Sequence, residues 1–426
     1  MRLARWSAVR RSWADEPFRR HVARLAVARM ISVTGGRAAG IALVAVVYER
    51  SGGSGAWVAA AVLTQFATSV LCGPWAGALG DRFDRRAVMV VSDLSAAAVF
   101  VGIAFVHSPV VLIVFTAVAS IAESPFGPAS SAFLVMLVPE SERTRATAAR
   151  ASGNAVGTIL GGVLGGVAVA AFGGATAFLL NAASFVFSAL LVLSIRGKYR
   201  AERSTDPAHA GVWAGVRLIA RNDALRLVLA ANGAALVGYG MINVAEYPLF
   251  AQLGSGALGF GIATAGYGVG NFVGARFGRR AEGAYREKRA LFFGWLVGGA
   301  SIVACGVIPS TVSVVILFSI AGVGDSAALL AGTLITQRHT PDPVRARVFA
   351  ASSSVNIGAM SVAMFIAGFL IGPLGPVALC LVCGFVTLSA LVPSARVPPR
   401  GKPPWRPDAE PAQTGDPRRH RWLFAT

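Results

Sequence analysis

Five ionisable side chains lie inside long apolar runs of this chain, where they could exchange protons or hold a charged group. They are Arg37, Asp93, Glu123, Glu246 and Asp325. An ionisable residue in such a segment is costly unless it faces protein or a water-filled cavity, and it often marks the path of a proton, an ion or a substrate. These residues are the candidate chemistry of the chain, and the apolar runs are the elements that must position them.

The apolar runs are long enough to form bilayer-spanning helices, which need about 20 apolar residues each. Twelve such runs cover residues 25–48, 57–79, 87–106, 109–137, 147–171, 174–195, 224–250, 257–277, 289–308, 311–336, 347–371 and 375–395. The pattern predicts an all-α membrane protein with twelve transmembrane helices in two six-helix bundles, at residues 25–195 and 223–395. The remaining polar stretches are predicted to be a basic cytoplasmic arm at 1–24, a cytoplasmic linker at 196–222 and a disordered basic cytoplasmic tail at 396–426.

The composition agrees with a membrane protein. The chain is 55% hydrophobic and 14% charged, whereas soluble domains carry about 25% charged residues. Its formal net charge is +19, from 39 Lys and Arg against 20 Asp and Glu. The basic residues gather in the gaps after every second run and at both termini, which predicts that both termini lie in the cytoplasm. We prefer this topology to nucleic-acid binding, because the charge lies in short gaps between apolar runs.

Neither a metal site nor a nucleotide site is predicted. The four cysteines all lie in apolar runs, and Cys380 and Cys383 have no histidine or second cysteine pair nearby. The five histidines have no metal-ligand spacing. The glycine-rich segments are not followed by the Lys-Ser/Thr of a phosphate loop. We therefore expect no metal, no cofactor and no catalytic residue.

The two predicted halves contain an internal repeat. Glu123 and Asp325 are related by an offset of 202 residues, and Asn154 and Asn356 are related by the same offset. Serine, proline and arginine positions between them also match at this offset, so that the similarity is a repeat rather than chance. Because each half has an even number of spans, the copies share one orientation. We expect Glu123 and Asp325 at the same depth, facing each other across a central cavity.

Two interpretations of the intramembrane charges remain open. In the first, Glu123 and Asp325 accept protons or bind a cation, and Arg37 beside them tunes their ionisation. In the second, Arg37 forms a structural ion pair that locks the halves together. Arg37 could also bind a carboxylate or phosphate of a substrate. The other members of the predicted substrate and proton-coupling site are Glu246, Asn154 and Asn356.

A polar loop between the second and third runs resembles a known family sequence. It is GALGDRFDRR over residues 77–86. This resembles the loop between helices 2 and 3 of the major facilitator superfamily, Gly-x-Leu-(Ala/Gly)-Asp-Arg-x-Gly-Arg-Arg/Lys, although Asp84 stands where that pattern has glycine. The resemblance implies a cytoplasmic gate, and its residues here are Gly77, Gly80, Asp81, Arg82, Arg85 and Arg86.

We expect this loop to contact the second half of the chain. Asp81 is predicted to meet the N-terminal end of the eleventh span, using the helix dipole and either Arg345 or Arg347. That contact would hold the cytoplasmic side closed while the cavity faces outward. Asp93 and Arg145 are assigned to the same gate. The alternative is that the arginines only set the topology.

The fifth span carries a stripe of small residues. Gly157, Gly161 and Gly165 recur with a spacing of four, and such stripes let helices pack backbone to backbone. Gly161, Gly165 and Gly166 also resemble the antiporter motif of the superfamily, Gly-Pro-x-x-Gly-Gly, with Gly162 in the place of proline. The resemblance favours proton-coupled export, and plain helix packing explains the glycines as well.

The resemblance extends over residues 25–395 and points to the enterobactin-exporter and multidrug-efflux branch. It implies a secondary transporter of the bacterial inner membrane that exports a small amphipathic molecule, such as a drug, siderophore or secondary metabolite. Proton antiport would drive it as the two halves rock about a central site. We expect a monomer whose partners are the substrate, protons and the lipid bilayer, and no nucleic acid. The alternatives are a proton-coupled uptake symporter of the same fold and a membrane protein that transports nothing.

Overall fold

The computed structural model describes residues 17–195, 212–279, 283–340 and 342–398, apart from a few of their side chains. All regular elements among these residues are helices, which confirms the predicted all-α fold. Those of the first half are α2 (Pro17–Arg50), α3 (Gly55–Arg82), α4 (Arg85–Phe105), α5 (Pro109–Glu123), α6 (Phe126–Leu137), the short η1 (Glu140–Glu142), α7 (Arg143–Phe172) and α8 (Gly174–Leu193). Those that follow are α9 (Val212–Arg221), α10 (Asp223–Gln252), α11 (Gly256–Arg279), α12 (Ala284–Val307), α13 (Thr311–Arg338), α14 (Asp342–Leu388) and α15 (Leu391–Arg396).

The helices account for the twelve predicted spans. Ten segments of the described chain are long and apolar enough to cross a membrane. One of them contains α14, which breaks at Gly375 (φ 72°) and therefore provides two spans. The remaining span is α11, which has 24 residues and a glycine-rich, less apolar sequence.

Three element boundaries differ from the prediction. The span predicted at 109–137 is broken between α5 and α6, because Pro125 has no N–H to donate, and Ser124 Oγ instead donates to the Ile121 carbonyl oxygen at 2.9 Å. The predicted arm is partly helical, since α2 begins at Pro17. The predicted linker contains α9, whose buried Ile219 packs on α14. Residues 1–16, 196–211 and 399–426 lie outside the described part.

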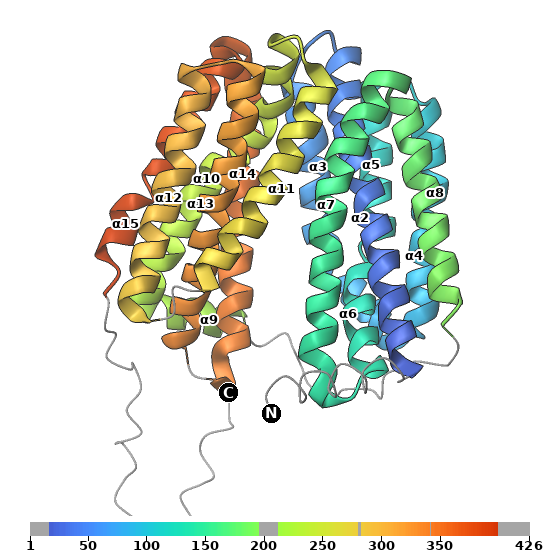
Figure 1. Cartoon of the computed structure of the whole chain (residues 1–426), viewed down its shortest axis with the longest axis horizontal. Helices are drawn as coiled ribbons and strands as arrows, with labels where there is room; N and C mark the ends of the chain where they lie inside the picture. Colours follow the sequence, from blue (N-terminus) through green and yellow to red (C-terminus); the bar gives the residue numbers. More distant parts are fainter. Residues whose placement is uncertain (1–16, 196–211, 280–282, 341, 399–426) are drawn as a thin grey trace, which may run out of the picture.

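The helices form two bundles side by side, α2–α8 and α10–α15 (Figure 1). In the first bundle α2 packs on α7 and α8, and α4 packs on α8. In the second, α10 packs on α14, and α13 packs on both α11 and α12. We call the end of the molecule where α2 begins and α3 meets α4 the terminal face, and the other end the distal face.

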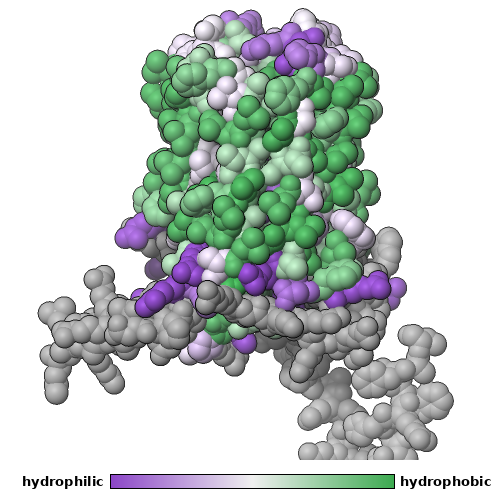
Figure 2. Space-filling view, turned by 90° about the vertical axis from the view of Figure 1, so that its right-hand side faces the viewer, coloured by the Kyte–Doolittle hydropathy of each residue, from purple (hydrophilic) through white to green (hydrophobic). Residues whose placement is uncertain are grey.

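Apolar side chains cover the middle of the molecule. Figure 2 shows them as a broad band on one side, with hydrophilic residues at both ends. On α8, for example, Leu180, Phe187 and Leu190 are exposed. A soluble protein would rarely expose a patch of this extent, whereas a helix bundle in a bilayer presents such a band to lipid.

The two bundles contact each other through small residues toward the distal face. A β-carbon added at Gly261 of α11 would lie 2.5 Å from the Gly162 carbonyl oxygen of α7. A β-carbon added at Gly55 of α3 would lie 2.4 Å from the Ile371 side chain of α14. Tyr247 of the second bundle also donates a hydrogen bond to Glu49 of the first, at 3.2 Å. In Figure 1 the ribbons of the two bundles lie closer together here than at the terminal face.

The glycines of α7 lie on two faces of the helix. A β-carbon added at Gly161 would lie 2.6 Å from the Thr34 carbonyl oxygen, so that α2 and α7 touch backbone to backbone. The glycines packed on α2 in this way are Gly153, Gly157, Gly161 and Gly165. Those packed on α11 of the other bundle are Gly162 and Gly166.

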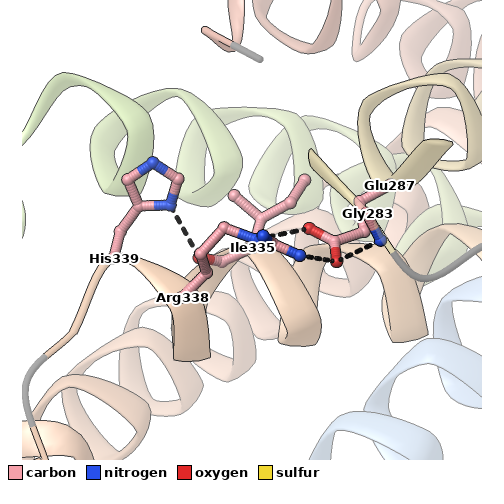
Figure 3. Close-up of polar contacts among 5 residues, drawn as sticks. All are labelled: Gly283, Glu287, Ile335, Arg338 and His339. Carbon is pink, nitrogen blue, oxygen red and sulfur yellow. Dashed lines mark hydrogen bonds and ion pairs between the residues drawn. The ribbon is translucent and has the colours of Figure 1, made fainter. Parts of the chain in front are cut away.

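A buried ion pair joins α12 to α13 at the terminal face (Figure 3). Glu287 is 2% exposed and accepts hydrogen bonds from Arg338 Nε at 3.1 Å and Nη2 at 2.5 Å. The backbone N–H of Gly283 donates to the same carboxylate at 3.3 Å. Bidentate, charge-assisted bonds of this kind are strong and directional. They fix the first turn of α12 against the last turn of α13.

Replacing Gly261 with valine should destabilise the protein by about 1–3 kcal/mol, the usual cost of overpacking, because the new side chain would collide with α7. Thermal unfolding in detergent measures this. The control is Gly358→Ala, where an added β-carbon meets no described atom within 4 Å. Equal melting temperatures for the two variants would contradict tight packing between α7 and α11.

Arg338→Ala should destabilise the protein more than Glu287→Gln, because it leaves a buried carboxylate without its cation. We expect a loss of up to about 3 kcal/mol, the lower end of the range for broken buried pairs, since the Arg338 side chain is itself 46% exposed. Chemical unfolding of both variants, with the exposed Arg286→Ala as the control, tests the order. A larger loss for Glu287→Gln would show that the carboxylate does not depend on Arg338.

Candidate functional site

Charged residues from both bundles meet in one group, which we call the Arg37 group: Arg37 of α2, Glu246 of α10, Tyr267 of α11 and Asp325 of α13. The Arg37 guanidinium lies within electrostatic range of the Glu246 carboxylate and the Tyr267 hydroxyl. The Tyr267 hydroxyl donates a hydrogen bond to Asp325 Oδ2 at 2.5 Å. An arginine of the first bundle thus lies within electrostatic range of an acid and a tyrosine of the second, and that tyrosine is bonded to a further acid.

Asp325 is buried with only one oxygen bonded. Its side chain is 7% exposed. Its Oδ1 atom is buried and has no hydrogen-bond partner among the described residues. A carboxylate offers acceptor sites on both oxygens, and a carboxyl group can carry a proton on one of them. Asp325 is therefore able to take up a proton or a cation at Oδ1.

A cavity of about 70 Å³ lies beside the Arg37 group. Glu246 and Asn243 of α10 line it together with Tyr239 and Tyr267. The two tyrosine rings lie 6.4 Å apart, and the Tyr239 hydroxyl donates to the Ala321 carbonyl oxygen at 3.4 Å. A polar cavity of this size has room for water molecules. Water there would give Glu246 a path for proton exchange.

A second group lies within the first bundle, and we call it the Arg29 group: Arg29 of α2, Asp93 of α4, Glu123 of α5 and Asn154 of α7. Arg29 Nε donates to Asn154 Oδ1 at 2.9 Å, and the guanidinium lies within electrostatic range of Glu123 and Asp93. Asp93 is 2% exposed, and its Oδ2 atom has no hydrogen-bond partner among the described residues. Glu123 lines a small cavity of about 30 Å³.

The structure brings Arg37 and Asp325 of the predicted cluster into one group through Tyr267, and it places Glu123 in the other group. Glu123 lies beside Arg29, and Asp325 is bonded to Tyr267. Both partners are absent from the sequence prediction. Arg29 lies close to the predicted start of the first span, where an arginine is expected for topology alone, and a single tyrosine in an apolar run gives no signal that it binds an acid.

A larger cavity of about 450 Å³ lies in the second bundle, between α10, α13 and α14. Its walls are mainly apolar. Its polar lining residues are Asn232, Thr333, Thr336, Ser352, Ser353 and Asn356. A pocket of this volume with a few polar groups suits a small amphipathic molecule. The predicted site residue Asn356 therefore lies at a cavity, whereas its repeat mate Asn154 is bonded to Arg29.

Arg85 and Arg86, the first two residues of α4 after the short loop from α3, bond within the first bundle. Arg85 Nη1 donates to the Ala132 carbonyl oxygen of α6 at 3.3 Å. Arg86 Nε donates to the Val192 carbonyl oxygen of α8 at 3.3 Å. The Val192 carbonyl lies in the last turn of α8, where cations are favoured. These two arginines therefore anchor the loop to its own bundle.

The positions of the remaining predicted gate residues do not test the predicted gate. Arg82 is exposed at the end of α3, and Gly77 lies one turn before it in the same helix. The surroundings of Gly80 and the side chain of Asp81 lie outside the described part. The basic residues predicted to join the gate lie in the first turns of α7 and α14, and they are Arg145, Arg345 and Arg347. The contact between Asp81 and α14 stays a prediction.

Solved structures with the same fold are transporters. A bacterial homologue of the human lysosomal transporter Spinster, inward-facing and unoccupied, has a TM-score of 0.66 at 17% identity, over 89% of this chain and 95% of that one. The nucleoside transporter NupG has a TM-score of 0.71 at 12% identity, over 88% and 98%. A POT family transporter in complex with 5-aminolevulinic acid has a TM-score of 0.69 at 12% identity, over 88% and 95%. At these identities the likeness shows the fold alone.

Sequence comparison gives the family. The uncharacterised MFS-type transporter YfiS of Bacillus subtilis (strain 168) is 26% identical over 329 residues, which is 74% of this chain and 78% of that protein. The model of the Major Facilitator Superfamily matches residues 25–245 and 228–426. Because these matches extend over nearly the whole chain, the protein belongs to the major facilitator superfamily.

Proposed function

We propose that this protein exports a small amphipathic molecule across the bacterial inner membrane in exchange for protons. The family and the fold indicate a multi-pass membrane transporter rather than an enzyme. The direction, the coupling ion and the class of substrate are the proposed part. The observation that carries the proposal is Asp325, a buried carboxyl with one oxygen bonded to Tyr267 and the other without a partner among the described residues.

A buried carboxyl can couple proton movement to a change of conformation. A charged carboxylate inside the membrane is costly unless a cation lies nearby. The charged form therefore favours the conformation in which the cation is near, and protonation removes that preference. For Glu246 this cation is Arg37, which lies in the other bundle and would move relative to Glu246 when the bundles rock. Glu123 lies in electrostatic range of Arg29 within the first bundle, so its protonation changes the charge balance of that bundle's buried group and not a contact between the bundles.

The proposed direction of transport rests on the position of the larger cavity and on the positive-inside rule. Val228 and Thr336, which line that cavity, lie near the terminal-face ends of α10 and α13. The arginine-rich loop at residues 82–86 is at the same end, and such loops favour the cytoplasm. The bundles contact each other toward the distal face. In this arrangement the cavity lies toward the cytoplasm, where an exporter loads its substrate and an uptake transporter releases it. The resemblance to exporters favours loading.

Cysteine labelling tests the orientation. In a background without the four native cysteines, His107→Cys, which lies in the distal loop between α4 and α5, should react with a membrane-impermeant maleimide in intact cells. Ser141→Cys, in the loop between α6 and α7 at the terminal face, should react only after permeabilisation. Both positions are exposed. The reverse pattern would place the terminal face outside and reverse the proposed direction.

Proton coupling is tested with ethidium, an amphipathic probe, in acid-loaded inverted vesicles that contain the protein. Ethidium should enter the vesicles while protons leave, and a pH-sensitive dye inside reports the protons. Asp325→Asn and Glu123→Gln should each reduce this exchange at least tenfold, because they remove the group that carries the proton.

The control for this assay is Asp223→Asn, whose side chain is 77% exposed at the start of α10 and which should exchange like the unmodified protein. Loss of vesicle ethidium together with protons would favour an uptake symporter. Ethidium movement without any proton movement would exclude antiport, and movement of neither would contradict the proposed export of this class of molecule.

A further inference from the structure

We propose that the larger cavity binds the cationic, N–H-donating head group of an amphipathic molecule, an ammonium or guanidinium group, between Asn232 and Asn356. This names the substrate class for the transport function proposed above and rests on it. The two copies of the internal repeat differ here: the first bundle holds the guanidinium of Arg29 at the position where the second bundle has the cavity.

Two close glycine contacts align the copies in space. A β-carbon added at Gly35 of α2 would lie 2.2 Å from the Ser184 hydroxyl on α8, the last helix of the first bundle. A β-carbon added at Gly238 of α10 would lie 2.1 Å from the Thr387 hydroxyl on the last long helix of the second. Both glycines therefore occupy the same place in their bundles, and α2 corresponds to α10 in register.

This register pairs Arg29 with Asn232, each six residues before its glycine. Asn154 and Asn356 are the repeat mates on the facing helices. In the first bundle the guanidinium of Arg29 donates to Asn154 Oδ1 at 2.9 Å. In the second, the Oδ1 atoms of Asn232 and Asn356 are both buried and have no hydrogen-bond partner among the described residues. Because the Asn232 side chain is shorter than that of Arg29, it leaves open in the second bundle the space that the Arg29 side chain fills in the first.

The two asparagines lie on the same cavity and close to each other. Both line the cavity of about 450 Å³. A β-carbon added at Gly233, the residue after Asn232, would lie 3.8 Å from Asn356 Oδ1. A β-carbon added at Gly332 of α13 would lie 3.0 Å from Asn232 Nδ2. One head group could therefore contact both amides.

Among the described residues, the buried polar atoms of this cavity that lack a hydrogen-bond partner are the amide oxygens of Asn232 and Asn356, and both are acceptors. The hydroxyls of Thr333 and Thr336 donate to the carbonyl oxygens of Leu329 and Gly332 in their own helix, at 2.9 Å and 2.8 Å. Their lone pairs remain, as do the two amide oxygens. A buried acceptor without a donor is costly, so the fitting ligand donates. Ammonium and guanidinium groups have donors only.

The cavity also suits the rest of such a ligand. Apolar side chains such as Leu236, Phe349 and Met360 line it and would contact an apolar body. A cation in an apolar site needs negative charge nearby. Asp325 lies one helical turn beyond the lining residue Leu329, about 6 Å along α13, and it has one unpartnered oxygen.

The test measures binding to the purified protein in detergent by isothermal titration calorimetry. The probe is 4-phenylbutylguanidinium, and its uncharged analogue of the same shape is 4-phenylbutylurea. We expect the guanidinium to bind at least tenfold tighter than the urea. Asn232→Leu and Asn356→Leu should each weaken guanidinium binding about tenfold, equivalent to ~1.4 kcal/mol. Gln337→Leu, at the exposed end of α13, is the matched control and should bind like the unmodified protein.

Two further variants separate recognition from mere loss of structure. Asn356→Asp should tighten guanidinium binding and leave urea binding unchanged, because a carboxylate pairs with the cation. Asn232→Arg should restore in the second bundle the pair that Arg29 and Asn154 form in the first. It should abolish probe binding while the melting temperature stays the same or rises.

Equal binding of the two probes, binding of neither, or no tightening by Asn356→Asp would overturn the inference. Its failure is distinguishable from failure of the proposed function. Guanidinium binding with the expected pattern, in a protein that does not exchange the probe for protons in vesicles, would leave this site standing and remove the antiport mechanism. Exchange of ethidium for protons without selective guanidinium binding would support the antiport mechanism and rule out this binding site.

Discussion

The cost of leaving a polar or charged group unpaired in an apolar interior is the constraint on which the rest of this structure depends. Inside a bilayer, helix formation alone provides hydrogen-bond partners for the backbone N–H and C=O groups. The polar groups that still need partners are those of the side chains. The chain places its intramembrane charges in two groups, each built around an arginine of α2. At the terminal face the same requirement is met by Glu287, which is held by Arg338 and by the backbone of Gly283.

Glycine determines which helices can come close enough to form these groups. One glycine face of α7 packs on α2 inside the first bundle and lies directly beside Arg37, since a β-carbon added at Gly161 would lie 2.7 Å from Arg37 Cβ. The other face meets α11, the helix that carries Tyr267. The arginine and the tyrosine are therefore brought together by backbone contacts. If the bundles rock, contacts between glycines can open without the rearrangement of interdigitated side chains. The contact between α7 and α11 is therefore a suitable hinge surface between the bundles.

The fold could be predicted from the sequence, because it depends on the lengths of the apolar runs and on the offset of the repeat, and both can be read along the chain. The lengths of the apolar runs predict the spans, and the offset between Glu123 and Asp325 predicts the duplication. The side-chain partners were not accessible, because they depend on how far each helix is rotated and shifted against its neighbours. Arg29 is the clearest example: in the sequence it is one more arginine near the start of a span, and in the structure it lies beside Glu123 and Asn154.

The duplication also explains why equivalent residues have different surroundings. Asn154 and Asn356 occupy matching positions, and each presents an amide oxygen that must be satisfied when buried. The first bundle meets this need with its own arginine, which also balances two carboxyl groups and leaves little space. The second bundle has only Asn232 at that position, so it keeps a cavity and two acceptors. A duplicated protein can thus use one copy of a site to hold itself together and leave the other copy for a ligand that supplies the missing donor.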